Sequence, residues 1–321
     1  MPGGDLTRVG ASVVALAAGV AAVVLVAELL SRTPGPVHAA APAASPAAPA
    51  PAPPAFPAPP AGAVVFARAD GANVLALAAR PSGASLLLQA SVVGPQGRGV
   101  AGLEASFSLG NRTARAAACG PGCYRTVVPA AGRPAAVLVK LRGGPAATSW
   151  RVGLPGRWPP ADATELVGRA GRVWRSLRSL TYRERLASDP AHAVTSAWRV
   201  AAPDRLAYQV KGGYASVVIG GRRWDRAPGG RWIESSQSSP VRQPVPFWQA
   251  VADAHVLGSG RVGGRATWRV SFFDRATPAW FEVSLDKRTL HTLELSMVAT
   301  AHFMHDVYGG FDEPAGIRPP G

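Results

Sequence analysis

The sequence predicts a mainly β protein in which a β-sandwich is followed by a strongly curved antiparallel sheet with few helices. Short β-rich segments, separated by Gly, Pro and Asn turns, fill residues 63–157 and 181–308. Residues 165–180 repeat apolar side chains with a period near 3.6, which predicts one amphipathic helix before the second sheet. Residues 10–27 form an uninterrupted apolar run, which predicts one transmembrane helix before both folded units.

The apolar run lies within residues 1–32 and would span about 27 Å as a helix, close to the thickness of a bilayer core. This length favours an uncleaved anchor. The small-x-small pattern at residues 37–39 leaves a cleaved signal peptide, and hence a secreted protein, as the alternative. Residues 33–62 contain eleven prolines and predict a disordered Pro/Ala-rich linker that extends as polyproline II.

Cys119 and Cys123 are the only cysteines, and the sequence Gly-Pro-Gly lies between them. A tight turn of this kind brings the two Cβ atoms to bridging distance. The pair therefore indicates a disulfide formed in an oxidising compartment, with two buried thiols as the alternative. Together with the apolar run, the disulfide predicts a single-pass cell-membrane protein whose folded domains lie outside the cytoplasm.

The formal net charge is +15, and all but three of the basic residues are Arg. These residues alternate with apolar ones along the predicted strands, and no block of five or more occurs. This pattern argues against the clustered basic stripe of a nucleic-acid-binding protein. It leaves a basic surface resting on anionic lipid, or charge that is simply scattered and solvated.

Residues 63–157 predict six or seven short strands in a small antiparallel sandwich. The segments VVGPQGRGVAGLEASFSLG and CGPGCYRTVVP resemble the YtkA/FixH-like immunoglobulin-type domains of bacterial envelopes. Those domains often accompany copper-handling membrane proteins, so the resemblance implies such a setting. Because this unit has no His and no Met, it lacks soft copper ligands, and we interpret it as a spacer or docking module.

We expect residues 158–313 to form the second unit and residues 314–321 to form a tail after it. Asp162 and Thr164 are the candidate N-caps of its helix. Residues 247–254 predict a second, short helix. Successive strands are joined by turn sequences and predict an antiparallel meander, with the turns at residues 203–204, 227–230, 262–264 and 286–289.

The second unit also carries the motifs AAPDRLAYQV, VIGGRRWDRAPGGRW, GRATWRVSFF and WFEVSLDKRTLHTLELSM, with VYGGF as the closing strand. Together with the preceding helix, these motifs resemble the LolA/LppX-type superfamily of periplasmic lipid and lipoprotein carriers. The resemblance implies an α+β half-barrel whose concave face holds acyl chains. It implies a non-catalytic binding protein with a lipid or lipoprotein as its partner. The apolar run adds the expectation of a membrane anchor, and another envelope membrane protein is a further possible partner if the protein acts in signalling.

Seven of the nine tryptophans lie in the second unit beyond its first residue, Trp158. An aromatic-lined concave pocket for an apolar ligand is one use of such residues, and ordinary core packing is the alternative. The candidates for lining a ligand cavity are Trp174, Trp198, Trp224, Trp232, Trp248, Trp268 and Trp280.

A cluster of soft ligands near the end of the chain is a second candidate site: Met297, His302, Met304 and His305. Imidazole and thioether groups suit copper, so an accessory or sensor protein of envelope copper handling is the alternative function. Strand alternation places His302 and Met304 on one face and His305 on the other, and core Met with surface His is the other interpretation. A third function is a structural protein-interaction module whose half-barrel is filled by its own side chains.

Sequence patterns of catalysis are weak. Residues 258–263 spell G-x-G-x-x-G, but they precede a predicted strand, whereas a dinucleotide-binding loop follows a strand and opens a helix. The motifs G-x-S-x-G, H-E-x-x-H and the Walker loop do not occur. The acidic residues Glu184, Asp225, Asp274 and Glu282 stand beside Arg residues, so we expect them to form ion pairs rather than a catalytic couple. We therefore expect no enzyme and no obligatory cofactor.

Overall fold

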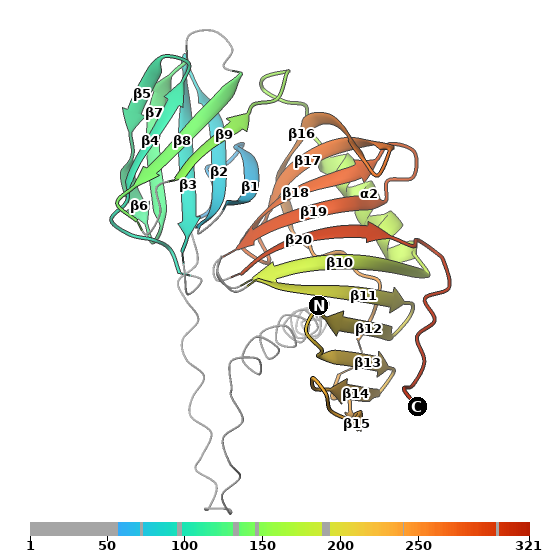
Figure 1. Ribbon diagram of the computed structural model, residues 1–321. Helices are drawn as coiled ribbons and strands as arrows, with labels where there is room; N and C mark the ends of the chain where they lie inside the picture. Colours follow the sequence, from blue (N-terminus) through green and yellow to red (C-terminus); the bar gives the residue numbers. More distant parts are fainter. Residues whose placement is uncertain are drawn as a thin grey trace, which may run out of the picture.

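A computed structural model of the chain describes residues 57–70, 73–94, 98–130, 135–144, 148–187, 193–239, 241–299 and 302–321. These residues form a sandwich of two sheets and, beside it, a long curved sheet with one helix (Figure 1). The mainly β class with antiparallel sheets and one helix is thus confirmed. The predicted anchor and most of the predicted linker lie outside the described residues, and no helix within the described ranges is long and apolar enough to span a membrane.

The first unit consists of two antiparallel sheets that share one apolar core. Leu77, Leu88, Phe107 and Val139 are buried between them. Cys119 and Cys123 form the predicted disulfide. One sheet contains, in spatial order, β1 (Val64–Asp70), β2 (Asn73–Ser82), β3 (Ser85–Val93), β7 (Cys123–Pro129) and β6 (Ala117–Gly120). The other contains β5 (Arg112–Arg115), β4 (Glu104–Leu109), β8 (Ala136–Arg142) and β9 (Thr148–Gly153).

The second unit is one eleven-stranded antiparallel sheet built from two meanders. Its first strand, β10, pairs with both its sequence neighbour β11 and the last strand, β20, and this pairing joins the two meanders. In spatial order, the first meander contributes β15 (Ile233–Ser236), β14 (Arg222–Arg226), β13 (Ala215–Ile219), β12 (Arg205–Val210), β11 (Val194–Ala201) and β10 (Ser179–Ala187). The second meander continues the sheet with β20 (His302–Gly309), β19 (Thr292–Ala299), β18 (Ala279–Asp286), β17 (Arg265–Asp274) and β16 (Val251–Val262).

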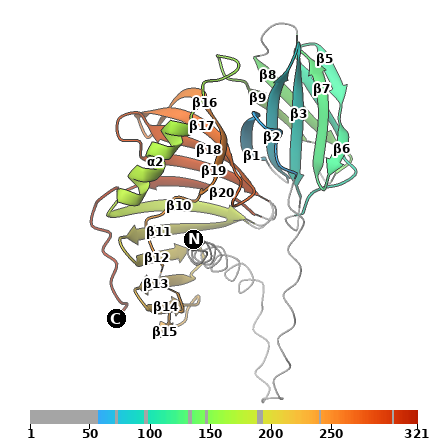
Figure 2. The same ribbon diagram turned by 180° about the vertical axis from the view of Figure 1, so that it is seen from behind.

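Helix α2 (Thr164–Ser176) lies across one face of this sheet, which curves around it (Figure 2). We call this face the inner face and the opposite one the outer face. The helix is shorter than predicted, because Leu177 is already extended and β10 begins at Ser179. Its N-cap is Ala163 rather than either predicted residue, although the Asp162 carboxylate accepts hydrogen bonds from the backbone and side chain of Thr164.

The prediction of a short helix at residues 247–254 is wrong. Its second half belongs to β16, which begins at Val251 and pairs with β17. The register shifts between Ala252 and His255, where Asp253 takes a positive φ of 51°, so a β-bulge occupies the place of a helical turn. Asp274 accepts hydrogen bonds from the backbone N–H groups of Gln249 and Ala250, which fixes the entry into this strand.

The outer face packs directly on the first unit. Small side chains on β1 and β2, among them Ala67 and Ala78, lie against buried Phe273, Trp280 and Phe303 of the second unit. Alanines allow the two backbones to approach closely, and large rings fill the space that they leave. The residue types on the two faces are therefore complementary in size.

Both ends of the described chain also pack onto the sheets. Gln89 donates hydrogen bonds to the carbonyl oxygens of Pro57 and Ala58, within the range predicted as linker. At the other end, Ile317 in the predicted tail is buried against Trp224 and Val217 on the outer face.

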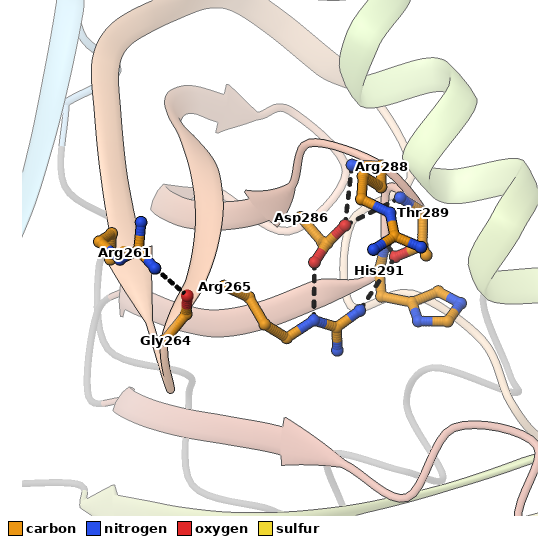
Figure 3. Close-up of polar contacts among 7 residues, drawn as sticks. All are labelled: Arg261, Gly264, Arg265, Asp286, Arg288, Thr289 and His291. Atoms are coloured by element: carbon orange, nitrogen blue, oxygen red, sulfur yellow. Dashed lines mark hydrogen bonds and ion pairs between the residues drawn. The ribbon is translucent and has the colours of Figure 1, made fainter.

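The turn between β18 and β19 shows how local sequence fixes a connection. Asp286 Oδ1 accepts hydrogen bonds from the backbone N–H groups of Arg288 at 2.8 Å and Thr289 at 2.9 Å, and Oδ2 lies 2.7 Å from Arg265 Nε (Figure 3). Burial raises the pKa of Asp286, but the hydrogen bonds from Thr289 and Arg288 and the charge of Arg265 outweigh it, so the pKa is lowered.

We expect Asp286→Ala to lower the free energy of unfolding by about 2 kcal/mol at neutral pH, because it removes hydrogen bonds to a charged acceptor. The pKa of Asp286 is lower in the folded state than in the unfolded state, where it is about 4. This stabilisation is therefore present when the pH is above the pKa of the unfolded state, and it is lost as the pH falls through the pKa of the folded state. Urea denaturation at pH 7 and pH 3 checks both statements. Asp286→Asn, which keeps one acceptor oxygen, is the control, and an alanine variant as stable as the wild type at pH 7 would contradict this account.

Candidate functional site

The inner face is filled beside α2 by the protein's own aromatic side chains. Trp174 of α2 lies edge-on to Trp248 and Tyr308, with ring centroids 5.5 and 5.0 Å away. Trp248 in turn contacts Phe272 of β17 and Phe281 of β18. All five side chains are buried. This half of the inner face is a packed core rather than an open bowl.

Next to this core, three rings from neighbouring strands and a fourth from the turn before β13 stack in a row. Tyr182 stacks on Trp198 at 5.4 Å between centroids, Trp198 on Tyr208 at 4.4 Å, and Tyr208 on Tyr214 at 6.3 Å. We call these four residues the aromatic layer. Tyr208 is buried, whereas Tyr182, Trp198 and Tyr214 are partly exposed. The layer therefore presents ring surface on which an apolar group can lie.

The segment from residue 241 to residue 250 returns from β15 to β16 and borders the aromatic layer. Phe247 lies edge-on to Tyr182 at 6.4 Å and to Trp174 at 6.3 Å, so one ring contacts both the layer and the packed core. Val241, at the start of the segment, packs against the same core and is only partly buried. The segment is irregular between the two strands, so fewer backbone hydrogen bonds hold it than hold the sheet beneath it.

Two carboxyl groups lie beneath the aromatic layer. Glu184 of β10 and Asp306 of β20 are directly opposite each other in the register, and they are 5% and 0% exposed. Glu184 Oε2 accepts hydrogen bonds from Ser196 Oγ and Trp198 Nε1, both at 2.9 Å. Asp306 Oδ2 accepts a short hydrogen bond from the Tyr308 hydroxyl, whereas Oδ1 is buried with no hydrogen-bond partner. We call Glu184 and Asp306 the carboxyl pair.

Burial raises the pKa of both members of the carboxyl pair. The charge of Glu184 raises the pKa of Asp306 further, and the hydrogen bonds from Ser196, Trp198 and Tyr308 only partly oppose these effects. A raised pKa beside a second carboxyl group is also found in catalytic dyads. Here both groups are buried under rings, and a substrate must come within hydrogen-bond reach of a catalytic acid. We interpret the pair as a support that holds Trp198 and Tyr308 in place.

The seven predicted tryptophans do not share one surface. Trp174, Trp198, Trp248 and Trp268 belong to the inner face. Trp224 and Trp232 pack on the other side with Ile317, and Trp280 is buried against the first unit. Side chains alternate between the two faces along a strand, and this alternation separates the tryptophans. Trp268 is four residues from the inner-face residue Phe272 on β17 and so shares its face, whereas Trp280 is next to the inner-face residue Phe281 on β18 and so points to the outer face.

The soft-ligand cluster is divided in the same way. Met297 and Met304 are direct cross-strand partners, and both are buried in the inner-face core. His305 lies on the outer face, where Nδ1 is 3.2 Å from Ser296 Oγ and Nε2 is 3.4 Å from Glu294 Oε1. The side chain of His302 lies outside the described residues. Among the described residues, no group of three or more His, Cys, Asp or Glu side chains is placed to hold a metal ion.

The expectation that the acidic residues pair with Arg is confirmed for two of them and wrong for two. Asp225 pairs with Arg223, and Glu282 with Arg269, whereas Asp274 accepts backbone hydrogen bonds. Glu184 faces Asp306, a pairing that depends on the contact between the first and last strands of the unit. Residue spacing could have shown that each carboxyl group lies beside a Tyr. Glu184 is two residues from Tyr182, and Asp306 is two residues from Tyr308, so each pair shares one face of its strand.

Comparison with protein-family models and with curated proteins found no match. Several solved structures are similar to the chain. The lipoprotein LppX from Mycobacterium tuberculosis has 15% sequence identity, covers 49% of this chain and 100% of its own, and gives a TM-score of 0.38. A LolA superfamily protein from Nitrosomonas europaea has 9% identity, with coverage of 50% and 96% and a TM-score of 0.24.

A putative outer membrane lipoprotein-sorting protein domain from Vibrio parahaemolyticus has 9% identity, with coverage of 48% and 93% and a TM-score of 0.26. The similarity is one of fold. The names of these structures agree with the LolA/LppX-type resemblance indicated by the sequence motifs, and the function has to be argued from the residues of this chain.

Proposed function

We propose that the protein is a non-catalytic, extracytoplasmic binding protein that holds a lipid or acylated ligand on the aromatic layer of its inner face. The observation that carries this proposal is the row of stacked rings, three of which are partly exposed although their neighbours in the core are buried. Such ring faces favour apolar chains, and each buried CH₂ group contributes about 0.8 kcal/mol. The proposal places the ligand beside the packed core rather than within it.

Residues 241–247, which precede the buried Trp248, are the part of the inner face that a ligand would displace. Phe247 covers one edge of Tyr182, so its outward movement would expose further ring surface. The N-terminal apolar run would anchor the protein in the membrane, where lipids and lipoproteins are at hand. The disulfide supports the extracytoplasmic location, because such bonds persist in oxidising compartments.

Quenching of tryptophan fluorescence by dibrominated stearate tests the proposal, because bromine quenches only those rings that it approaches closely. We expect saturable quenching of the full-length chain in nonionic detergent. Trp198→Phe keeps an aromatic ring in the layer, so binding should persist while the quenched fraction of the emission falls. Trp280→Phe is the matched control, since Trp280 lies on the outer face against the first unit.

Equal quenching in the two variants, or no saturable quenching in the wild type, would contradict the proposed site. The second outcome would favour a structural protein-interaction module, the function that the packing of Trp174 and Trp248 also supports.

A further inference from the structure

Two turns of the second unit lie at the same end of neighbouring strands. Residues 211–214 join β12 to β13, and residues 227–232 join β14 to β15. We call them the paired turns. The strands that they connect are the part of the second unit farthest from the first unit (Figure 1).

The paired turns contact each other. A Cβ atom on Gly213 of the first turn would lie 3.0 Å from the Cβ atom of Pro228 in the second. Gln209 also joins them, since its side chain accepts a hydrogen bond from Arg226 Nη2 at 3.4 Å and donates one to the carbonyl oxygen of Tyr214 at 3.1 Å. The two turns and the residues beside them therefore form one surface.

This surface exposes apolar side chains. Ile233, directly after the second turn, is 64% exposed, the highest fraction among the large hydrophobic residues that the structure describes. Trp232 and Tyr214 are partly exposed. Trp and Tyr are enriched where a membrane meets water, because their rings are apolar and their polar tips stay hydrated. The apolar part of the surface thus has the composition of a membrane interface.

The same surface is basic. Lys211 and Arg231 are exposed, and the Arg226 guanidinium group lies 4.7 Å from the centroid of the Trp232 ring. Within the described parts of the chain, none of these three cations forms an ion pair with a carboxylate. Residues 209–216 and 226–233 contain these three cations and no Asp or Glu, so their net charge is 3 − 0 = +3.

The nearby carboxylates on β14 and β15 are occupied by other Arg residues. Asp225 Oδ2 lies 2.6 Å from Arg223 Nε, and Glu234 Oε1 lies 2.8 Å from Arg222 Nε. These two ion pairs leave the charge of the paired turns uncompensated, so it remains available to an external partner.

From this combination we infer that the paired turns dock on the surface of an anionic lipid bilayer. A bilayer presents negative charge over an extended area, so the three cations need no fixed spacing, unlike the ligands of a single small anion. Each Lys or Arg at such a surface strengthens binding about fivefold. The exposed rings and Ile233 gain further stability by entering the interface.

Docking goes beyond the proposed function and does not require it. The two are neighbours in space, because Tyr214 of the first turn is also the last ring of the aromatic layer. A docked protein would therefore hold one end of the aromatic layer at the membrane, where a lipid is at hand.

Vesicle titration of the full-length chain, held in nanodiscs of phosphatidylcholine, tests this inference. The vesicles contain dibrominated phosphatidylcholine, alone or mixed with phosphatidylglycerol, and bromine quenches the tryptophan rings that enter the lipid. We expect saturable quenching with the mixed vesicles and much weaker quenching with the neutral ones. Quenching that Trp232→Phe removes reports docking, whereas quenching that Trp198→Phe removes reports lipid in the aromatic layer, so the two proposals can fail separately.

Two pairs of charge substitutions make the result specific. Lys211→Gln combined with Arg231→Gln should weaken binding to the mixed vesicles about 30-fold, because two surface cations are lost. Arg205→Gln combined with Arg242→Gln removes the same charge from exposed residues near the opposite end of these strands, and it should leave binding unchanged.

The apolar contribution has its own matched pair. Ile233→Ser should weaken binding several-fold, because the side chain no longer enters the interface. Val307→Ser should have no effect, since Val307 is also exposed but lies on β20, away from the paired turns. Both positions are exposed, so neither substitution should lower the melting temperature.

Equal binding to neutral and mixed vesicles would overturn the inference, and so would quenching that Trp232→Phe leaves unchanged. Equal weakening by the two charge pairs would show binding to the general positive charge of the protein rather than to the paired turns. Saturable binding of polyglutamate without any binding of vesicles would assign the surface to an acidic protein instead.

Discussion

Trp174→Ala is expected to lower the free energy of unfolding by about 3–5 kcal/mol, the largest effect of any single substitution proposed for this chain. Trp174 is the aromatic side chain by which α2, the only helix among the described residues, packs on the sheet. Its ring contacts Trp248, Phe247 and Tyr308. Its removal leaves a cavity that α2 cannot close, because the sheet on the other side is held by its own strand pairing.

Guanidinium denaturation with detection by far-ultraviolet circular dichroism measures this loss. Trp232→Ala is the control, because Trp232 is only partly buried and lies away from the inner face. We expect it to cost less than about 1.5 kcal/mol. Similar small losses for both variants would mean that the inner face is not a packed core.

Asp306→Asn is expected to stabilise the protein at pH 7 by about 1–3 kcal/mol, because it removes a buried ionisable group that faces Glu184. The amide oxygen still accepts the hydrogen bond from Tyr308. Both pKa values of the carboxyl pair are higher in the folded state than in the unfolded one. As the pH rises from about 4, the unfolded chain therefore releases protons first and stability falls until the folded pKa values are passed.

The advantage of Asp306→Asn should accordingly shrink toward zero as the pH falls below about 4, where the wild-type carboxyl groups become protonated in the unfolded state as well. Urea midpoints measured between about pH 3 and pH 8 check this dependence. Asp306→Ala provides the comparison, since it leaves the Tyr308 hydroxyl without its acceptor and should lose most of the gain. A variant less stable than the wild type at pH 7 would contradict the raised pKa values.

Local signals explain what the sequence predicted well. Four predicted turns each connect two strands that follow one another in the sequence, so a few neighbouring residues determine each connection. These turns contain Pro203-Asp204, Gly229-Gly230, Gly263-Gly264 and Asp286. The disulfide is local in the same sense, since its cysteines are four positions apart in the sequence. The prediction of a helix at residues 247–254 was wrong, because two interactions override the local helix propensity. One is the β-bulge in β16, and the other is the pair of hydrogen bonds from the backbone of Gln249 and Ala250 to Asp274, which is 25 and 24 residues further along the chain.

Pairings between distant residues explain what the sequence did not reveal. The contact of β10 with β20 brings Glu184 to Asp306 across more than a hundred residues, and no pattern along the chain specifies that pairing. The division of the tryptophans was open to prediction from alternation on each strand, as Trp268 and Trp280 show. The packing of β1 and β2 on the outer face joins two units that are far apart in the sequence, and composition and periodicity do not encode it.

The native mass spectrum of the full-length chain, purified in detergent from cells that supply membrane lipids, tests the central claim most directly. We expect additional masses that correspond to one bound lipid and disappear when the protein is denatured. These masses should persist in Trp280→Phe and weaken in Trp198→Ala, which removes a ring from the aromatic layer. A spectrum that contains only the bare chain, from a preparation in which lipid is abundant, would contradict the proposed binding function.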